Sequence, residues 1–127
     1  MAKLLLDTHT FLWFLSGDAR LTKKQKEALL DPDNTLFMSI ASFWEMTIKL
    51  SLGKLSCMGG MKELAKNATA LGVTIEPISA ETLFVLEELV QLHKDPFDRI
   101  IIATAINKGY AIVTGDDGIK QYSIPTV

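Results

Sequence analysis

The 127-residue sequence has almost no cysteine, no long apolar run and no strong net charge. Cys57 is the only cysteine, so no disulfide can form within the chain. No apolar stretch approaches the ~20 residues that cross a bilayer. Only three leucines separate Lys3 from Asp7, too few for the apolar part of a secretory signal. We therefore expect a cytoplasmic protein without membrane contact.

The charge balance gives no sign of a nucleic-acid-binding surface. Thirteen basic and fifteen acidic residues leave a net charge of -2, whereas such surfaces are usually basic. Any contact with nucleic acid would have to come from a local basic patch or through a metal ion. The length and the 48% of hydrophobic residues predict one globular domain over residues 1–127.

Short apolar runs alternate with helical patterns along the chain. Strands are predicted at 4–6, 35–38, 73–75 and 110–114, and helices at 11–15, 21–30, 39–52, 61–71, 79–92 and 97–108. Thr8 or Thr10 is expected to cap the first helix, and Ser39 or Ser42 to begin the third. The alternation predicts an α/β fold with a mainly parallel sheet. The residues after the first strand lack the glycines that a dinucleotide-binding loop needs. The sequence therefore excludes a dinucleotide-binding protein.

Two candidate site residues follow buried strands. Asp7 comes directly after Leu4–Leu6, and Asp116 follows the strand at 110–114. Ligands of open α/β sheets bind at the carboxyl ends of the strands. A turn or helix cap would also explain Asp116, and Asp117 competes with it for the same role.

Two further acids belong to predicted helices. Glu45 is the only charge between Asn34 and Lys49, on a helix that is apolar nearly all round. A buried carboxylate must be paired or bound to a metal, and pairing with Lys49 four residues later stays open as the alternative. Asp98 follows a capping pattern, Asp95-Pro96, and taken alone it is explained better by capping than by catalysis.

The combination of the four acids indicates a metal site. In a right-handed parallel sheet, the strand ends and the starts of the following helices share one edge. Four carboxylates there would repel one another unless a cation neutralised them, and an all-oxygen site suits Mg²⁺ or Mn²⁺. Such a site supports water activation and a phosphoryl transition state. The unrelated spacings of His9, His93 and Cys57 argue against zinc, and neither histidine is expected to act directly.

Four segments carry a resemblance to a known family: LLLDTHTFLW, SIASFWEMTIKLSLGKL, HKDPFDRIIIATAI and IVTGDD. In this order, across essentially the whole chain, they resemble the PIN-domain family and most closely its VapC-type toxin ribonucleases. The resemblance implies a three-layer α/β/α sandwich with a central parallel sheet of five strands. It also implies a Mg²⁺- or Mn²⁺-dependent endoribonuclease of a type II toxin–antitoxin module, a cognate antitoxin that covers the site, and a homodimer.

The resemblance also implies roles for individual residues. The family's four acids fall on Asp7, Glu45, Asp98 and Asp116, with Asp116 preferred to Asp117 because the family pattern is Thr-x-Asp. Supporting positions fall on Thr8, Ser39, Thr114 and Asp117. Arg99 could hold a carboxylate or an RNA phosphate, or could form a surface ion pair. Candidate basic contacts with RNA are Lys49, Lys54, Lys94 and Arg99.

Two other function classes remain as alternatives. A phosphohydrolase with Asp7 as its nucleophile would need a second aspartate two residues later, where His9 stands. A binding module without catalysis, such as a receiver-like or degenerate PIN domain, would have no need of all four acids. A trapped aspartyl-phosphate would favour the phosphohydrolase, and a titration that finds no Mn²⁺ binding would favour the degenerate PIN domain.

Overall fold

The computed structural model describes residues 1–127 and confirms the predicted α/β architecture. No helix in it is both long and apolar enough to cross a membrane. The elements in chain order are β1 (Lys3–Leu6), α1 (Thr8–Ser16), α2 (Lys23–Leu30), β2 (Thr35–Ser39), α3 (Ile40–Ser51), α4 (Gly60–Ala70), β3 (Val73–Glu76), α5 (Ala80–Glu88), α6 (Pro96–Lys108), β4 (Ala111–Val113) and α7 (Asp117–Lys120).

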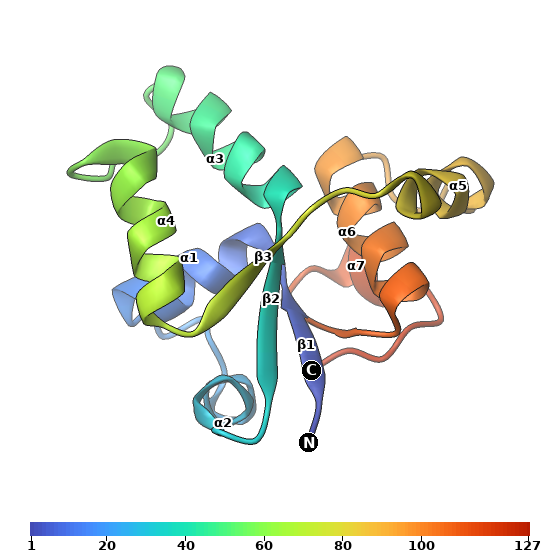
Figure 1. Ribbon diagram of the computed structural model, residues 1–127, viewed down its shortest axis with the longest axis horizontal. Helices are drawn as coiled ribbons and strands as arrows, with labels where there is room; N and C mark the ends of the chain where they lie inside the picture. Colours follow the sequence, from blue (N-terminus) through green and yellow to red (C-terminus); the bar gives the residue numbers. More distant parts are fainter.

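The sheet is parallel, and β1 lies inside it. Its four strands have the order β3-β2-β1-β4, and Figure 1 shows β2 and β1 side by side. Leu5 pairs with Phe37 of β2 on one side and with Ile112 of β4 on the other. β1 is flanked by strands on both sides. Its carboxyl end, which Asp7 follows, therefore lies in the middle of the row of strand ends along the carboxyl edge of the sheet.

The expected fifth strand is reduced to one isolated parallel bridge between Thr126 and Ile112. The Ile112 backbone N–H donates to Pro125 O at 3.0 Å, and the Val127 N–H donates to Ile112 O at 2.9 Å. Pro125 itself has no N–H to donate to a ladder. The outer side of β4 is therefore covered by a short irregular segment and not by a regular strand.

Alternation along β1 explains the layers. Successive residues of a strand point to opposite faces, so Leu4 and Leu6 enter one core cluster and Leu5 enters the other. Helices α1, α2 and α4 cover the first face, and α6 and α7 cover the second, as Figure 1 shows on the two sides of the sheet. This is the three-layer α/β/α sandwich that the sequence predicted.

The first helix differs from its prediction. It begins at Thr8 and is capped by Asp7, whose Oδ1 accepts a hydrogen bond from the Thr10 N–H at 2.8 Å. The two threonines expected as caps bind elsewhere, since Thr10 Oγ1 donates to Val113 O at 2.8 Å and Thr8 Oγ1 donates to Glu45. The cap thus brings Asp7 to the positive end of α1.

Two other helices start as their sequences predict. Ser39 caps α3, with its hydroxyl accepting from the Ala41 N–H at 3.1 Å. Asp95 caps α6, with Pro96 in the first turn. Helix α5, in contrast, ends at Glu88 and not at Leu92, because side chains from other elements bind the backbone that follows it.

Candidate metal centre

Asp7 is buried at the carboxyl end of β1, with 3% of its surface exposed. Its Oδ1 caps α1, and its Oδ2 accepts a short hydrogen bond from the Thr114 hydroxyl, at the end of β4. No lysine or arginine pairs with this carboxylate. The side chain is therefore held rigidly by two donors, while its negative charge has no cationic partner within the protein.

Asp116 is tied to Asp7 through Thr114. The Thr114 hydroxyl that donates to Asp7 also accepts from the Asp116 N–H at 2.9 Å. Asp116 Oδ1 caps α7 by accepting from the Gly118 N–H at 2.7 Å, and Oδ2 faces His93. The neighbouring Asp117 is exposed and makes no side-chain hydrogen bond or ion pair. This geometry brings Asp116, and not Asp117, into the cluster.

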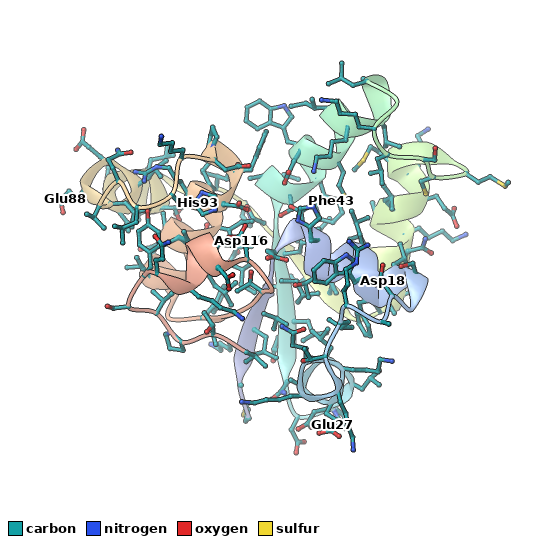
Figure 2. All side chains as sticks on the ribbon, turned by 180° about the vertical axis from the view of Figure 1, so that it is seen from behind. Asp18, Glu27, Phe43, Glu88, His93 and Asp116 are labelled. Carbon is teal, nitrogen blue, oxygen red and sulfur yellow. The ribbon has the colours of Figure 1, made fainter.

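Asp98 completes this part of the site. Its Oδ2 lies 3.0 Å from His93 Nε2, which lies 3.5 Å from Asp116 Oδ2 (Figure 2 shows His93 beside Asp116). One ligand atom from each of these three side chains lies within 4.8 Å of the others. The histidine, which was not expected to act directly, therefore lies between two of the four predicted acids.

The pKa of the Asp98 carboxyl is raised from its ordinary 3.8 to about 7. Burial is the largest cause, because it disfavours the charged form, and the charge of Asp95 is the second. His93 opposes the shift, whereas Asp116 and Asp7 add to it. The positive charge that the protein itself places near the Asp98 carboxyl is too small to keep its pKa at the ordinary value.

Glu45 forms the other end of the cluster. Its Oε1 accepts from the Thr8 hydroxyl at 2.7 Å, and its Oε2 lies 3.1 Å from Lys49 Nζ. The pairing with Lys49 that the sequence left open is therefore present. It leaves Glu45 tied to the residue next to Asp7, so one chain of contacts and sequence neighbours runs from Glu45 to Asp98.

The remaining supporting residues have other contacts. Ser39 caps α3 and makes no hydrogen bond to any of the four acids. Arg99 forms neither of the two protein contacts expected of it, a carboxylate contact or a surface ion pair. Its guanidinium donates to backbone carbonyls, including Leu89 O at 3.1 Å and His93 O at 3.2 Å. Arg99 thus holds the loop between α5 and α6.

The donor set fits a hard divalent cation. Asp98 and Asp116 supply carboxylate oxygens without any lysine or arginine partner, and one ligand atom of each lies within 4.8 Å of the other. Asp7 and Glu45 do not belong to this closest group: Asp7 is connected to Asp116 through Thr114, and Glu45 contacts Thr8, the residue after Asp7. Oxygen ligands suit Mg²⁺ and Mn²⁺, and a dipositive charge would offset both the burial and the neighbouring carboxylates that raise the Asp98 pKa.

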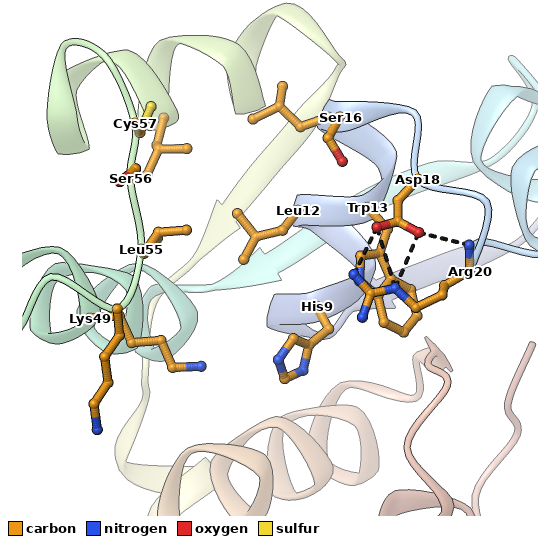
Figure 3. A pocket seen from close by; sticks show the side chains of 13 residues that line it. His9, Leu12, Trp13, Ser16, Asp18, Arg20, Lys49, Leu55, Ser56 and Cys57 are labelled. Carbon is orange, nitrogen blue, oxygen red and sulfur yellow. Dashed lines mark hydrogen bonds and ion pairs between the residues drawn. The ribbon is translucent and has the colours of Figure 1, made fainter.

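A pocket of about 410 Å³ lies between α1 and the segment that joins α3 to α4 (Figure 3), and none of the four acids lines it. Its apolar lining includes Leu12 and Leu55, and its basic lining includes Lys49 and Lys54. Because Lys49 also contacts Glu45, the pocket opens next to the acidic cluster. A chain bound at the centre could extend into it.

The raised pKa predicts how Asp98→Asn changes stability in the metal-free protein. A carboxyl whose folded pKa is near 7 and whose unfolded pKa is near 3.8 opposes folding increasingly as pH rises between these values. Asp98→Asn should therefore raise the free energy of unfolding at pH 8 and change it little at pH 4. The gain should be smaller than the ~4 kcal/mol of the full shift, because solvent screens this partly exposed group. Thermal unfolding across this range in chelator checks this, with Asp117→Asn as control. An equal effect at both pH values would contradict it.

A parallel α/β/α sandwich with an acidic cluster at the carboxyl edge of its sheet defines the class, an α/β protein with a candidate divalent-metal centre. The family model for the PIN domain matches residues 4–125, so the chain belongs to the PIN-domain family. The resemblance seen in the four sequence segments is thereby confirmed.

Individual relatives agree with this assignment. Ribonuclease VapC22 of Mycobacterium tuberculosis (strain ATCC 25618 / H37Rv) is 30% identical over 131 residues, covering 98% of this chain and 95% of that protein. VapBC2 from Rickettsia felis, solved with a DNA fragment from its promoter, has a similar fold, with a TM-score of 0.76 at 18% identity over 98% of this chain and 97% of that one. A toxin–antitoxin complex from Klebsiella pneumoniae gives 0.65 at 23% identity, over 98% and 95%.

Proposed function

We propose that this chain is a single-domain, metal-dependent endoribonuclease and the toxin of a type II toxin–antitoxin module. The observation that carries the proposal is the connected cluster of Asp7, Glu45, Asp98 and Asp116 at the carboxyl edge of the sheet. A relative that spans nearly the same length is named a ribonuclease.

The four acids are the proposed holders of Mg²⁺ or Mn²⁺. Such an ion, when bound, lowers the pKa of a water molecule and stabilises charge on phosphoryl oxygens. Thr114 and the Thr10 N–H fix the Asp7 carboxylate, while Thr8 and Lys49 fix Glu45. The protein thus presents ligands that lose little freedom on binding, which is the requirement for a precisely placed site.

In the proposed reaction, the oxygen of a water molecule forms a bond to phosphorus while the bond from phosphorus to a bridging oxygen of the RNA breaks. The water loses a proton to solvent, and the leaving oxygen takes up a proton to become a hydroxyl. The carboxylates orient this water and the scissile phosphate. Because water is the nucleophile, the 2′-hydroxyl of the RNA takes no part in bond formation. The products should therefore carry no 2′,3′-cyclic phosphate.

End analysis of the products tests this proposal. Purified protein is incubated with total RNA in Mg²⁺ or Mn²⁺ and, separately, in chelator, and the new ends are mapped. Cleavage in metal that yields linear phosphate ends is expected. Cyclic phosphate ends, or the same cutting in chelator, would contradict metal-assisted hydrolysis.

Lys54 is the proposed phosphate contact in the pocket beside the centre. It is exposed, lines the pocket and forms no ion pair, whereas Lys49 is engaged by Glu45. Lys54→Ala should weaken binding of single-stranded RNA and lower the slope of log affinity against log salt by about 0.7. Binding isotherms at several salt concentrations measure this. Lys26→Ala, on α2 away from this pocket, is the matched control, and equal slopes for both variants would contradict the assignment.

The proposed partners are RNA, a cognate antitoxin that covers the site, and a second copy of the chain. The R. felis and K. pneumoniae structures are described as a VapBC assembly and a toxin–antitoxin complex, respectively. Exposed apolar side chains such as Trp44, which packs edge-on against Phe97 with ring centroids 5.2 Å apart, offer surface for protein contact. A cellular RNA target places the proposed activity in the cytoplasm.

The phosphohydrolase alternative gains no support from the geometry. Asp7 is 3% exposed, and both its carboxylate oxygens accept hydrogen bonds, which suits a fixed ligand better than a nucleophile. The residue two positions later, His9, is exposed and lines the neighbouring pocket.

A further inference from the structure

His93 lies where it could either bind the metal or hold the acids that bind it. Its Nε2 is 3.0 Å from Asp98 Oδ2 and 3.5 Å from Asp116 Oδ2, and 14% of the side chain is exposed. A metal ligand needs a free lone pair on this nitrogen, whereas a hydrogen-bond donor carries a proton there. The other ring nitrogen decides between the two roles.

The second nitrogen, Nδ1, accepts a hydrogen bond from the Asp95 backbone N–H at 3.1 Å. A backbone N–H can only donate, so Nδ1 must offer its lone pair and cannot carry the proton. The proton of the neutral ring is therefore on Nε2, the nitrogen that lies 3.0 Å from Asp98 Oδ2 and 3.5 Å from Asp116 Oδ2. Binding a metal through Nε2 would require moving this proton to Nδ1 and breaking the hydrogen bond from Asp95.

We infer that His93 is a positioning residue which donates from Nε2 to Asp98 and Asp116, and that it is not a metal ligand. The inference deepens the proposed function, on which it rests for the metal itself. His93 lies between two carboxylates from different elements, α6 and the β4–α7 turn, and one ligand atom of each carboxylate lies within 4.8 Å of the other. The metal centre then keeps oxygen ligands only, which favours Mg²⁺ or Mn²⁺ over zinc.

The backbone that carries His93 is fixed from two sides. The Tyr122 hydroxyl accepts from the Leu92 N–H at 3.1 Å and the His93 N–H at 2.9 Å, and donates to Val90 O at 2.7 Å. Arg99 donates to three carbonyls of the same segment, those of Leu89, Val90 and His93. Tyr122 is only 7% exposed. This network fixes the backbone at Leu92 and His93, and so limits where the imidazole can lie.

The His93 imidazole also packs into a space that a side chain at position 118 would occupy. A Cβ at position 118 would lie 2.8 Å from His93 Cδ2 and 3.0 Å from His93 Nε2. Gly118 does not have a positive φ, so the need for glycine here is one of space. Its absent side chain lets the imidazole pack against the start of α7, beside Asp116.

The tautomer of His93 tests the inference directly. Protein labelled with ¹⁵N-histidine is studied by long-range ¹H–¹⁵N correlation, without metal and with saturating Mg²⁺. Only two histidines are present, and His93→Gln assigns them. We expect the Nε2–H tautomer under both conditions. An Nδ1–H tautomer in either would overturn the inference.

Metal affinity gives a second readout that does not depend on RNA cleavage. Calorimetric titration with Mn²⁺ should show about 10-fold weaker binding for His93→Ala, the scale of loss for outer-shell partners. His93→Gln, whose amide can donate from the same region, should restore much of it, and Tyr122→Phe should weaken binding less than His93→Ala. An equal loss of Mn²⁺ affinity in the Ala and Gln variants would indicate that His93 is a metal ligand. No loss of affinity in either variant would exclude any role of His93 in metal binding.

These outcomes separate the inference from the proposed function. A chain that shows the Nε2–H tautomer and the graded Mn²⁺ affinities but cuts no RNA would refute the ribonuclease and leave the role of His93 intact. A chain that cuts RNA while His93 carries its proton on Nδ1 would do the reverse.

Discussion

Asp7→Asn is expected to abolish RNA cleavage while the protein stays folded. The carboxylate is buried at the end of the central strand and has no lysine or arginine partner, so its charge is available to a cation. Asparagine keeps the shape and loses the charge. Activity should fall at least about 100-fold, because even partners outside the first coordination shell cost ~10–100-fold. Initial rates on a defined RNA, at saturating Mn²⁺, measure the effect.

The fold should survive because asparagine can keep the helix cap. Its Oδ1 can still accept from the Thr10 N–H, while its amide faces the Thr114 hydroxyl. A changed hydrogen bond costs about 1 kcal/mol, which corresponds to a shift of about 4 °C in Tm. Thermal unfolding of the metal-free variant is the control. A folded Asp7→Asn protein with wild-type activity would refute the role given to Asp7.

The second large effect separates two adjacent aspartates. Asp116→Asn should reduce cleavage about 100-fold, because Asp116 contacts His93 and is connected to Asp7 through Thr114. Asp117→Asn should leave the rate within about 2-fold, in keeping with the small effects of exposed substitutions, since Asp117 is exposed and unbonded. The two variants remove the same charge one residue apart, so each controls for the other.

The same pair of variants provides a check on folding. Asp116 caps α7 through the Gly118 and Ile119 N–H groups, and an asparagine oxygen can accept both. Circular dichroism should therefore be unchanged in both proteins. A loss of activity in Asp117→Asn equal to that in Asp116→Asn would show that net charge, and not the connected geometry, controls the rate.

Local sequence patterns predicted the helices and strands whose bounds are set by neighbouring residues in the chain. The three leucines of β1 predicted a strand buried on both faces, and Asp95-Pro96 predicted the start of α6. The parallel sheet then followed from the alternation of strands and helices. The prediction of a fifth strand was wrong, since only one isolated bridge, at Thr126, is present.

The sequence predicted only those features of the site that follow from the topology of the sheet. Strand ends and helix starts share one edge of a parallel sheet, so the four acids could be placed together without knowing their contacts. The partners of His93 could not be placed, because Tyr122 lies 29 positions further along the chain. The capping pattern at Asp95 was a usable signal, since a histidine two residues before a helix cap can turn back toward the helix start.

Arg99 shows the limit of arguing from a neighbour in sequence. Its position after Asp98 suggested a charged partner, yet its guanidinium donates to carbonyls of the loop that carries His93. A loop without a regular ladder leaves backbone acceptors open, and a buried acceptor must be satisfied. That requirement depends on where α5 ends, which the sequence pattern placed four residues too late.

The central claim is that carboxylates at the sheet edge hold a divalent ion that is needed to cut RNA. The most direct measurement is the cleavage rate of a defined single-stranded RNA by chelator-treated wild-type protein as Mn²⁺ is added back. The account predicts no cleavage in chelator and a saturable rise with Mn²⁺. Cleavage that proceeds at the same rate in chelator, or none at any Mn²⁺ concentration by folded protein, would contradict it.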